Sequence, residues 1–225
     1  MLYNLLYPLA GDIPFFNLFR YLTFRSGGAI ITALVISFVI GPRMIRWLRA
    51  NQHGGQPIRS DGPESHLLTK KGTPTMGGLM MLFAVTISTL LWADITSHYV
   101  WMVLFVTLGY GAIGFADDYL KVSKKNHKGL SGNKKLIAQF SIALGAAIWV
   151  SAVTPDTLNQ HLALPFVKDF LINLGVLYFP FVMLVLVGAS NAVNLTDGLD
   201  GLAIVPIMIA AACFGLIAYL VGNAV

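Results

Sequence analysis

The chain has 225 residues, of which 56% are hydrophobic and 11% are charged, and its formal net charge is +5. This composition, with a mean hydropathy of +0.71, excludes an ordinary soluble domain. The single cysteine, Cys213, excludes an internal disulfide framework and a cysteine-based zinc site, and no basic patch interleaved with aromatic residues supports a nucleic-acid partner. We expect an integral membrane protein that binds no nucleic acid.

Six apolar runs follow an aromatic amino-terminal stretch, Met1–Phe19, which suits a segment lying in the membrane interface. Each run is close to the roughly 20 residues that a helix needs to cross a bilayer. In chain order the runs are Leu22–Ile40, Met76–Ala93, Tyr99–Ala116, Leu136–Val153, Phe170–Val187 and Leu199–Val221. Because a helix satisfies its own backbone in lipid, the sequence predicts an all-α, polytopic transmembrane bundle of about six helices, forming one domain over residues 1–225.

Basic residues gather in two loops, with six in Gly41–Thr75 and six in Lys121–Lys135. By the positive-inside rule both loops are cytoplasmic. Counting helices then places Asp94–His98 and Thr154–Asp169 outside, and returns Gly188–Asp200 to the cytoplasm. The net positive charge can also be explained wholly by this topology and by attraction to anionic lipid.

A basic segment, KKGTPTMGG, leads into the second predicted helix and contains Lys70, Lys71 and Thr75. Ammonium groups, hydroxyls and a glycine pair near a helix amino terminus suit an anion. The alternative is positive-inside charge followed by a Pro/Gly helix start. The segment lacks the full Walker A pattern, so it does not indicate a P-loop ATPase.

Two adjacent acids, Asp117 and Asp118, stand at the end of the third apolar run, in GFADDYLKV. The helix dipole disfavours negative charge there, so the pair needs compensation. Lys121 lies on the same helical face, three and four residues further on, and could form ion pairs with both acids. One interpretation is a salt bridge at the membrane edge. The other is a proton acceptor beside a divalent cation, with the lysine holding a phosphate.

A second polar motif, NAVNLTDGLDGLA, opens the sixth predicted helix. Asp197 and Asp200 are three residues apart and share one helical face. Simple capping by Asn194 or Thr196 explains part of this motif but not the whole N-x-x-D-G-x-D-G pattern. Carboxylates and amides at this position could recognise a polar head such as a nucleoside, or supply oxygen ligands to a metal.

Taken together, GPESH with KKGTPTMGG, GFADDYLKV with NHKGL, and NAVNLTDGLDGLA resemble the phospho-N-acetylmuramoyl-pentapeptide transferases. These enzymes are a branch of the polyprenyl-phosphate sugar-1-phosphate transferase superfamily. The match runs in order from about Leu22 to Val221. It implies a Mg²⁺-dependent enzyme of the bacterial cytoplasmic (inner) membrane, with cytoplasmic active-site loops. Its substrates would be UDP-N-acetylmuramoyl-pentapeptide and undecaprenyl phosphate, and its products lipid I and UMP.

The resemblance also implies roles for individual residues. Asp117 would deprotonate or orient the lipid phosphate, with Asp118 and Lys121 beside it; the two acids could also contribute to a metal site. Lys70 and Thr75 would contact the nucleotide-sugar, as would Lys135, which comes from a less patterned stretch. The nucleotide side would be lined by Asn194, Asp197 and Asp200. Direct attack by the lipid phosphate and a covalent enzyme intermediate are both compatible with these residues.

The resemblance is incomplete at one end. Family members resemble a ten-helix bundle and carry, beyond the matched region, a further aspartate usually assigned to magnesium and a histidine-rich loop. This chain ends at Val225. We therefore expect an amino-terminal portion of the enzyme or a truncated gene product, which alone binds magnesium poorly and turns over little or not at all.

Several alternatives stay open. A sibling transferase could use a different UDP-sugar. A transporter could use the aspartates as relay groups in the membrane, although they fall at helix ends on one side and not at the midplane. A structural or partner-binding membrane subunit is a third alternative. The oligomeric state is also open, with a homodimer among the possible assemblies.

Overall fold

The computed structural model describes residues 1–52, 74–124, 129–164, 167, 170–196 and 202–223. The chain divides into two units, Met1–Asn159 and Gln160–Val225. The first contains α1 (Leu2–Leu6), η1 (Tyr7–Gly11), η2 (Pro14–Arg20), α2 (Leu22–Asn51), α4 (Gly78–Trp92), α5 (His98–Ser123) and α6 (Gly132–Val153). The second contains β1 (His161–Ala163), β2 (Leu171–Asn173), η3 (Gly175–Leu177), α7 (Tyr178–Thr196) and α8 (Ile204–Asn223).

The prediction of an all-α, multi-pass membrane protein is confirmed. Among the described residues, five helical segments are long and apolar enough to span a membrane. These are Leu22–Asn51, His98–Ser123, Gly132–Val153, Gly175–Thr196 and Ile204–Gly222. The second predicted run forms the shorter helix α4, whose 15 residues give a length of about 22 Å, less than the roughly 30 Å hydrocarbon core.

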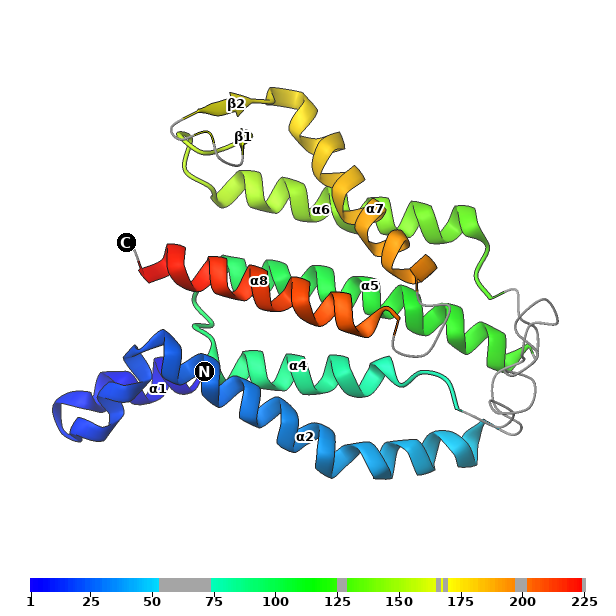
Figure 1. Cartoon of the computed structure of the whole chain (residues 1–225), viewed down its shortest axis with the longest axis horizontal. Helices are drawn as coiled ribbons and strands as arrows, with labels where there is room; N and C mark the ends of the chain where they lie inside the picture. The colour runs from blue at the N-terminus through cyan, green and yellow to red at the C-terminus, as the bar shows by residue number, and fades with distance from the viewer. Residues whose placement is uncertain (53–73, 125–128, 165–166, 168–169, 197–201, 224–225) are drawn as a thin grey trace. The chain divides into compact units, whose positions relative to one another are not determined.

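The predicted end of the first helix was wrong. The helix does not stop at Ile40 but continues through Pro42 to Asn51, so α2 has 30 residues. Pro42 cannot donate a hydrogen bond to the carbonyl of Phe38, yet one missing bond bends a helix without ending it when both flanks favour helix. The ribbon of α2 bends part-way along its length (Figure 1).

The predicted start of the fifth helix was also wrong. Residues that follow Phe170 form the short strand β2, which pairs antiparallel with β1 in the register Leu162↔Ile172. The helix begins only at Tyr178 and runs to Thr196, beyond the expected end at Val187. Short apolar runs do not distinguish a strand from a helix by hydropathy alone, which explains the error.

The helices of the first unit pack in chain order, α2 on α4, α4 on α5, and α5 on α6 (Figure 1). Several buried positions are small, such as Ala84 on α4 and Ala143 and Ala147 on α6. Small residues let helix backbones approach closely in lipid, where apolar burial itself gives little driving force. Gly28 is an example, because a Cβ at this position would lie 2.5 Å from the Trp92 ring.

Candidate functional site

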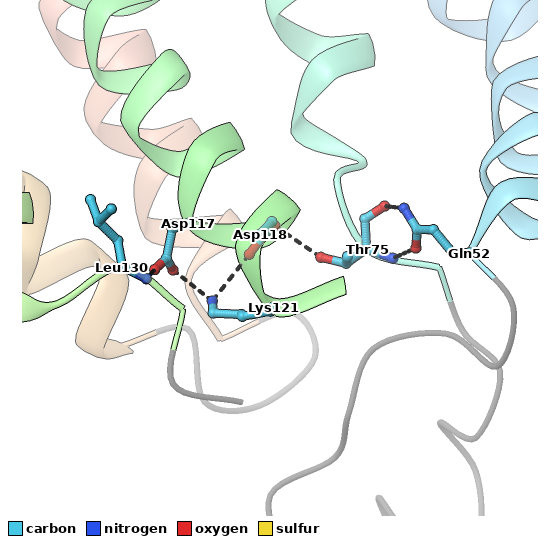
Figure 2. Close-up of polar contacts among 6 residues, drawn as sticks. All are labelled: Gln52, Thr75, Asp117, Asp118, Lys121 and Leu130. Atoms are coloured by element: carbon cyan, nitrogen blue, oxygen red, sulfur yellow. Dashed lines mark hydrogen bonds and ion pairs between the residues drawn. The ribbon is translucent and has the colours of Figure 1, made fainter. Parts of the chain in front are cut away.

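Asp117 and Asp118 lie near the carboxyl end of α5, and Lys121 joins them (Figure 2). The Lys121 Nζ atom is 2.6 Å from Asp117 Oδ2 and 3.1 Å from Asp118 Oδ1. The prediction that this lysine pairs with both acids is confirmed. We call these three residues the acidic cluster. Two carboxylates and one ammonium leave it with a formal charge of −1, so it still favours a further positive group.

Each carboxylate also has a partner from another segment (Figure 2). The Thr75 hydroxyl donates to Asp118 Oδ2 at 2.8 Å. The backbone N–H of Leu130 donates to Asp117 Oδ1 at 2.7 Å. Thr75 precedes α4 and Leu130 precedes α6, so these hydrogen bonds connect the acidic cluster to both neighbouring segments. The predicted site residue Thr75 therefore belongs to the same site as the acids.

Thr75 is itself held by Gln52, the residue that follows α2. The Gln52 carboxamide accepts from the Thr75 backbone N–H at 2.9 Å and donates to the Thr75 carbonyl at 3.2 Å. Only 6% of Gln52 is exposed. Because a buried amide that pairs both of its polar groups is strongly oriented, Gln52 fixes the backbone from which the Thr75 hydroxyl reaches Asp118.

Gly129 closes the other side of the acidic cluster. Its φ of +54° lies in the left-handed region that favours glycine. A Cβ at this position would overlap Asp117 Oδ1 and lie 2.8 Å from Lys121 Cε. Both the backbone conformation and the available space thus require glycine here, next to the N–H that Leu130 donates to Asp117.

The other predicted site residues differ in where they lie. Lys135, on α6, is half-buried, and its charge acts on Asp117. Asn194 is exposed on α7, in the second unit. Lys70, Asp197 and Asp200 lie outside the described residues. The structure therefore brings together Thr75, the acidic cluster and Lys135.

Sequence reasoning missed three contributors: Gln52, Gly129 and the backbone of Leu130. Gly129 and Leu130 belong to the NHKGL motif, but their part in holding Asp117 has no signal in local spacing. Gln52 follows a basic stretch of the sequence, where a glutamine is ordinarily exposed to solvent. Only the fold shows that it is buried.

The acidic cluster does not form a complete magnesium site by itself. Mg²⁺ prefers oxygen ligands, which both acids could supply. However, all four carboxylate oxygens already have partners, and the Lys121 ammonium contacts both carboxylates. Within the described ranges, no group of three or more histidine, cysteine, aspartate or glutamate side chains could hold a metal ion.

The chemistry open to the acidic cluster follows from its donors and acceptors. An ammonium has three N–H bonds, and within the described residues the two ion pairs of Lys121 use two of them, so the third is the one that can serve an anionic oxygen. A carboxylate held in place by hydrogen bonds can accept a proton from, or orient, a group that approaches it. Because its formal charge is −1, the acidic cluster suits an anion with an exchangeable proton only together with further positive charge, which Lys135 supplies near Asp117.

Comparison with known proteins gives the family and two curated relatives. The sequence model of glycosyl transferase family 4 matches residues 100–225. The phospho-N-acetylmuramoyl-pentapeptide-transferase of Granulibacter bethesdensis is 65% identical over 223 residues, covering 99% of this chain and 62% of the relative. The enzyme of the same name from Maricaulis maris is 56% identical over 229 residues, with the same coverage of each protein. The chain thus spans about three fifths of the length of these relatives.

Proposed function

Since the chain belongs to glycosyl transferase family 4, we propose that it takes part in transferring phospho-N-acetylmuramoyl-pentapeptide from its UDP carrier to undecaprenyl phosphate. The reaction forms lipid I and releases UMP. The observation that carries this proposal is the acidic cluster, in which two carboxylates share Lys121 and are tied to Thr75 and Leu130.

In the proposed reaction, an oxygen of the lipid phosphate forms a bond to the phosphorus that carries the sugar. The bond from that phosphorus to the oxygen bridging it to the uridine-bearing phosphate breaks, and the electron pair leaves with UMP. Asp117 orients the lipid phosphate or accepts its proton, and Lys121 offers its remaining N–H to a phosphate oxygen. Phosphoryl transfer between anions needs positioning and charge neutralisation more than covalent chemistry, which suits this cluster.

Gln52, Thr75 and Gly129 act as positioning residues in this proposal. Gln52 and Thr75 hold Asp118 from the α4 side, and Gly129 lets the Leu130 N–H reach Asp117 from the α6 side. Lys135 adds positive charge near Asp117. On the nucleotide side, the proposal assigns substrate contacts to Lys70, Asn194, Asp197 and Asp200 by their positions in the family motifs.

We propose that Mg²⁺ binds only with ligands in addition to those of the acidic cluster. Asp197 and Asp200 are the candidates within this chain, and no step is assigned to the ion. We expect the chain alone to bind Mg²⁺ weakly in calorimetric titration. Tight binding by the chain, lost in Asp117→Asn, would show that the acidic cluster holds the ion without further ligands.

We further propose the bacterial inner membrane as the location, with Thr75 and the acidic cluster at its cytoplasmic face. The distribution of lysine and arginine supports this orientation. In a Cys213→Ser background, cysteines introduced at Thr96 and Lys124, which flank α5 at its two ends, should react with a membrane-impermeant thiol reagent from opposite sides of sealed vesicles. Light scattering of the purified protein would test whether it forms a homodimer.

The experiment that tests the function uses the chain and a chimera in parallel. In the chimera, this chain replaces the matched region of the Granulibacter bethesdensis relative. We expect the chimera to release UMP and form a lipid-linked sugar only when undecaprenyl phosphate and UDP-N-acetylmuramoyl-pentapeptide are both present. Preference for another UDP-sugar would instead identify a sibling transferase. No release by a folded chimera, with the intact relative active in the same assay, would contradict the proposal.

A further inference from the structure

An apolar groove of about 770 Å³ lies between α2, α4 and α5, within the first unit. Its volume falls within the range of about 300–1,000 Å³ typical of ligand sites. Trp47 of α2, Phe83 of α4 and Phe115 of α5 are among its lining residues. Trp47 is 59% exposed and Phe83 48% exposed, so the groove is accessible from outside at these residues.

The helices that form this groove are suited to a lipid environment. Both α2 and α5 are long and apolar enough to span a membrane, and α4 between them is an apolar helix. A groove on such helices is filled by hydrocarbon or by protein, because an apolar surface of this kind does not hold water stably. The lining is compatible with the acyl chain of a lipid as one such occupant.

One end of the groove is positively charged. Arg43 lines the groove together with Trp47, four residues further along α2, and both face the same side of that helix. The 30 residues of α2 extend over about 45 Å, more than the roughly 30 Å of hydrocarbon, so part of this helix must leave the hydrocarbon, and we assign this end to the headgroup layer. Arginine and tryptophan are the residues that anchor proteins at that depth.

This charged end is separate from the proton-accepting group of the proposed reaction. Phe115 lines the groove, whereas Asp117, two residues later, projects about 200° further round α5. Asp117 accepts its hydrogen bond from Leu130, which precedes α6, and α6 contributes no residue to the groove lining. An anion at Arg43 would therefore approach from the α2 side.

We propose that the groove binds an anionic phospholipid. One acyl chain lies along Phe83 and Ala112, and the lipid phosphate pairs with the Arg43 guanidinium. Arginine presents a planar set of donors that matches phosphate, and one basic residue near the surface corresponds to about fivefold in affinity for an anionic lipid. This site is independent of the transferase proposal, because it uses none of the residues assigned to catalysis.

The test uses the full chain in nanodiscs and exploits Trp47 as a reporter within the groove. Bromine atoms on an acyl chain quench tryptophan fluorescence on contact. Phosphatidylglycerol and phosphatidylcholine, each with brominated chains, are compared at equal low mole fractions. The Trp47→Phe variant supplies the signal of the other three tryptophans, which is subtracted. We expect brominated phosphatidylglycerol to quench Trp47 at about fivefold lower mole fraction than brominated phosphatidylcholine.

Matched variants locate the interaction. Arg43→Gln should remove the preference for phosphatidylglycerol, whereas Arg49→Gln, at another exposed arginine of the same helix but outside the groove, should keep it. Ala112 is exposed and lines the groove, so the larger side chain of Ala112→Phe should occupy part of it and reduce quenching by both lipids. Because Arg43 is exposed, its replacement leaves the fold intact, and the comparison does not depend on the bulkier variant.

Three outcomes would overturn the proposal. Equal quenching by the two lipids would mean ordinary boundary lipid. Absence of quenching by either would mean that protein, from this chain or a second copy, covers the groove. Displacement by undecaprenyl phosphate at lower concentrations than by unlabelled phosphatidylglycerol would assign the groove to the lipid substrate. None of these measurements depends on transferase activity.

Discussion

Two polar regions stand at opposite ends of α5, and they are built differently. Before the helix, Asp94 Oδ1 accepts from Asn4 Nδ2 at 2.8 Å and from the N–H and hydroxyl of Thr96, at 3.0 and 2.7 Å. We call this the Asp94 turn. At the other end, the acidic cluster combines two neighbouring like charges with partners from the segments before α4 and α6.

The difference distinguishes a structural acid from a candidate functional one. The Asp94 carboxylate accepts hydrogen bonds from Thr96, two residues further on, and from Asn4 in the amino-terminal helix α1. These contacts stabilise a turn, and they are sufficient to explain why an acid stands at this position. Asp117 and Asp118 place two carboxylates where the helix dipole is unfavourable, and distant segments must organise around them. Lys121, Thr75 and the Leu130 N–H compensate these charges, and the convergence of three segments on two adjacent acids indicates a role outside folding.

The largest expected effect comes from removing the negative charge of one aspartate in each of the two regions. In the chimera, Asp117→Asn should reduce UMP release by about 10²–10⁴-fold, the range for losing a group that moves a proton. Asp94→Asn in the same chimera should leave the rate unchanged, because the Asp94 turn lies at the far end of α5. Equal losses in both variants would mean that the acids act through stability alone. Thermal unfolding of each variant separates these cases.

Gly129 offers a way to disturb the acidic cluster without changing its charge. Gly129→Ala should lower the free energy of unfolding by about 2–3 kcal/mol, because alanine is strained at φ +54° and its Cβ would displace Asp117. The control is Gly132→Ala, since a Cβ at Gly132 would meet no atom within 4 Å. Urea or thermal unfolding in detergent measures both. Equal stability of the two variants would contradict the described position of the Gly129 loop.

A substitution at Gln52 tests whether the contact with the segment before α4 holds the acidic cluster in place. Gln52→Ala should cost about 1–2 kcal/mol, because it leaves the Thr75 N–H and carbonyl without their partner. Hydrogen exchange of the Thr75 amide should accelerate while that of Leu130 stays slow. Asn51→Ala removes only an exposed bond to the Trp47 carbonyl within α2, so it should change neither amide. Unchanged protection of Thr75 in Gln52→Ala would remove this residue from the site.

The sequence predicts the features that depend on local spacing. Lys121 pairs with both acids because residues three and four apart share a helical face, and the apolar runs indicate the membrane helices. The contacts of Gln52 with Thr75 and of Thr75 with Asp118 join residues 23 and 43 positions apart. No periodicity within one segment contains that information, because it depends on how α2, α4 and α5 pack.

The errors have the same origin. The first apolar run was expected to end at Ile40, but the helix continues because the one hydrogen bond missing at Pro42 does not outweigh the favourable residues on both sides. The residues after Phe170 are apolar enough for a membrane helix, and pairing of Leu162 with Ile172 makes them a strand instead. In both places, interactions beyond the local window determine the structure.

The smallest expected effect concerns the Asp94 turn and its dependence on pH. Partial burial alone would raise the pKa of Asp94, but hydrogen bonds from Asn4 and Thr96 and the charge of Arg25 outweigh it and hold this pKa below its usual value. A folded-state pKa below the unfolded one contributes stability above the unfolded value, roughly pH 4, and this contribution is lost as the pH falls through the folded value. Because Asp94 is partly exposed, the contribution should stay below about 1 kcal/mol.

The free energies of unfolding of the wild type and of Asp94→Asn, measured from about pH 7 to pH 3, should therefore converge at the acidic end. Asp12→Asn, at an exposed acid in the same amino-terminal part, is the control. A stability difference between wild type and Asp94→Asn that stays constant with pH would mean that the turn depends on side-chain shape and not on charge.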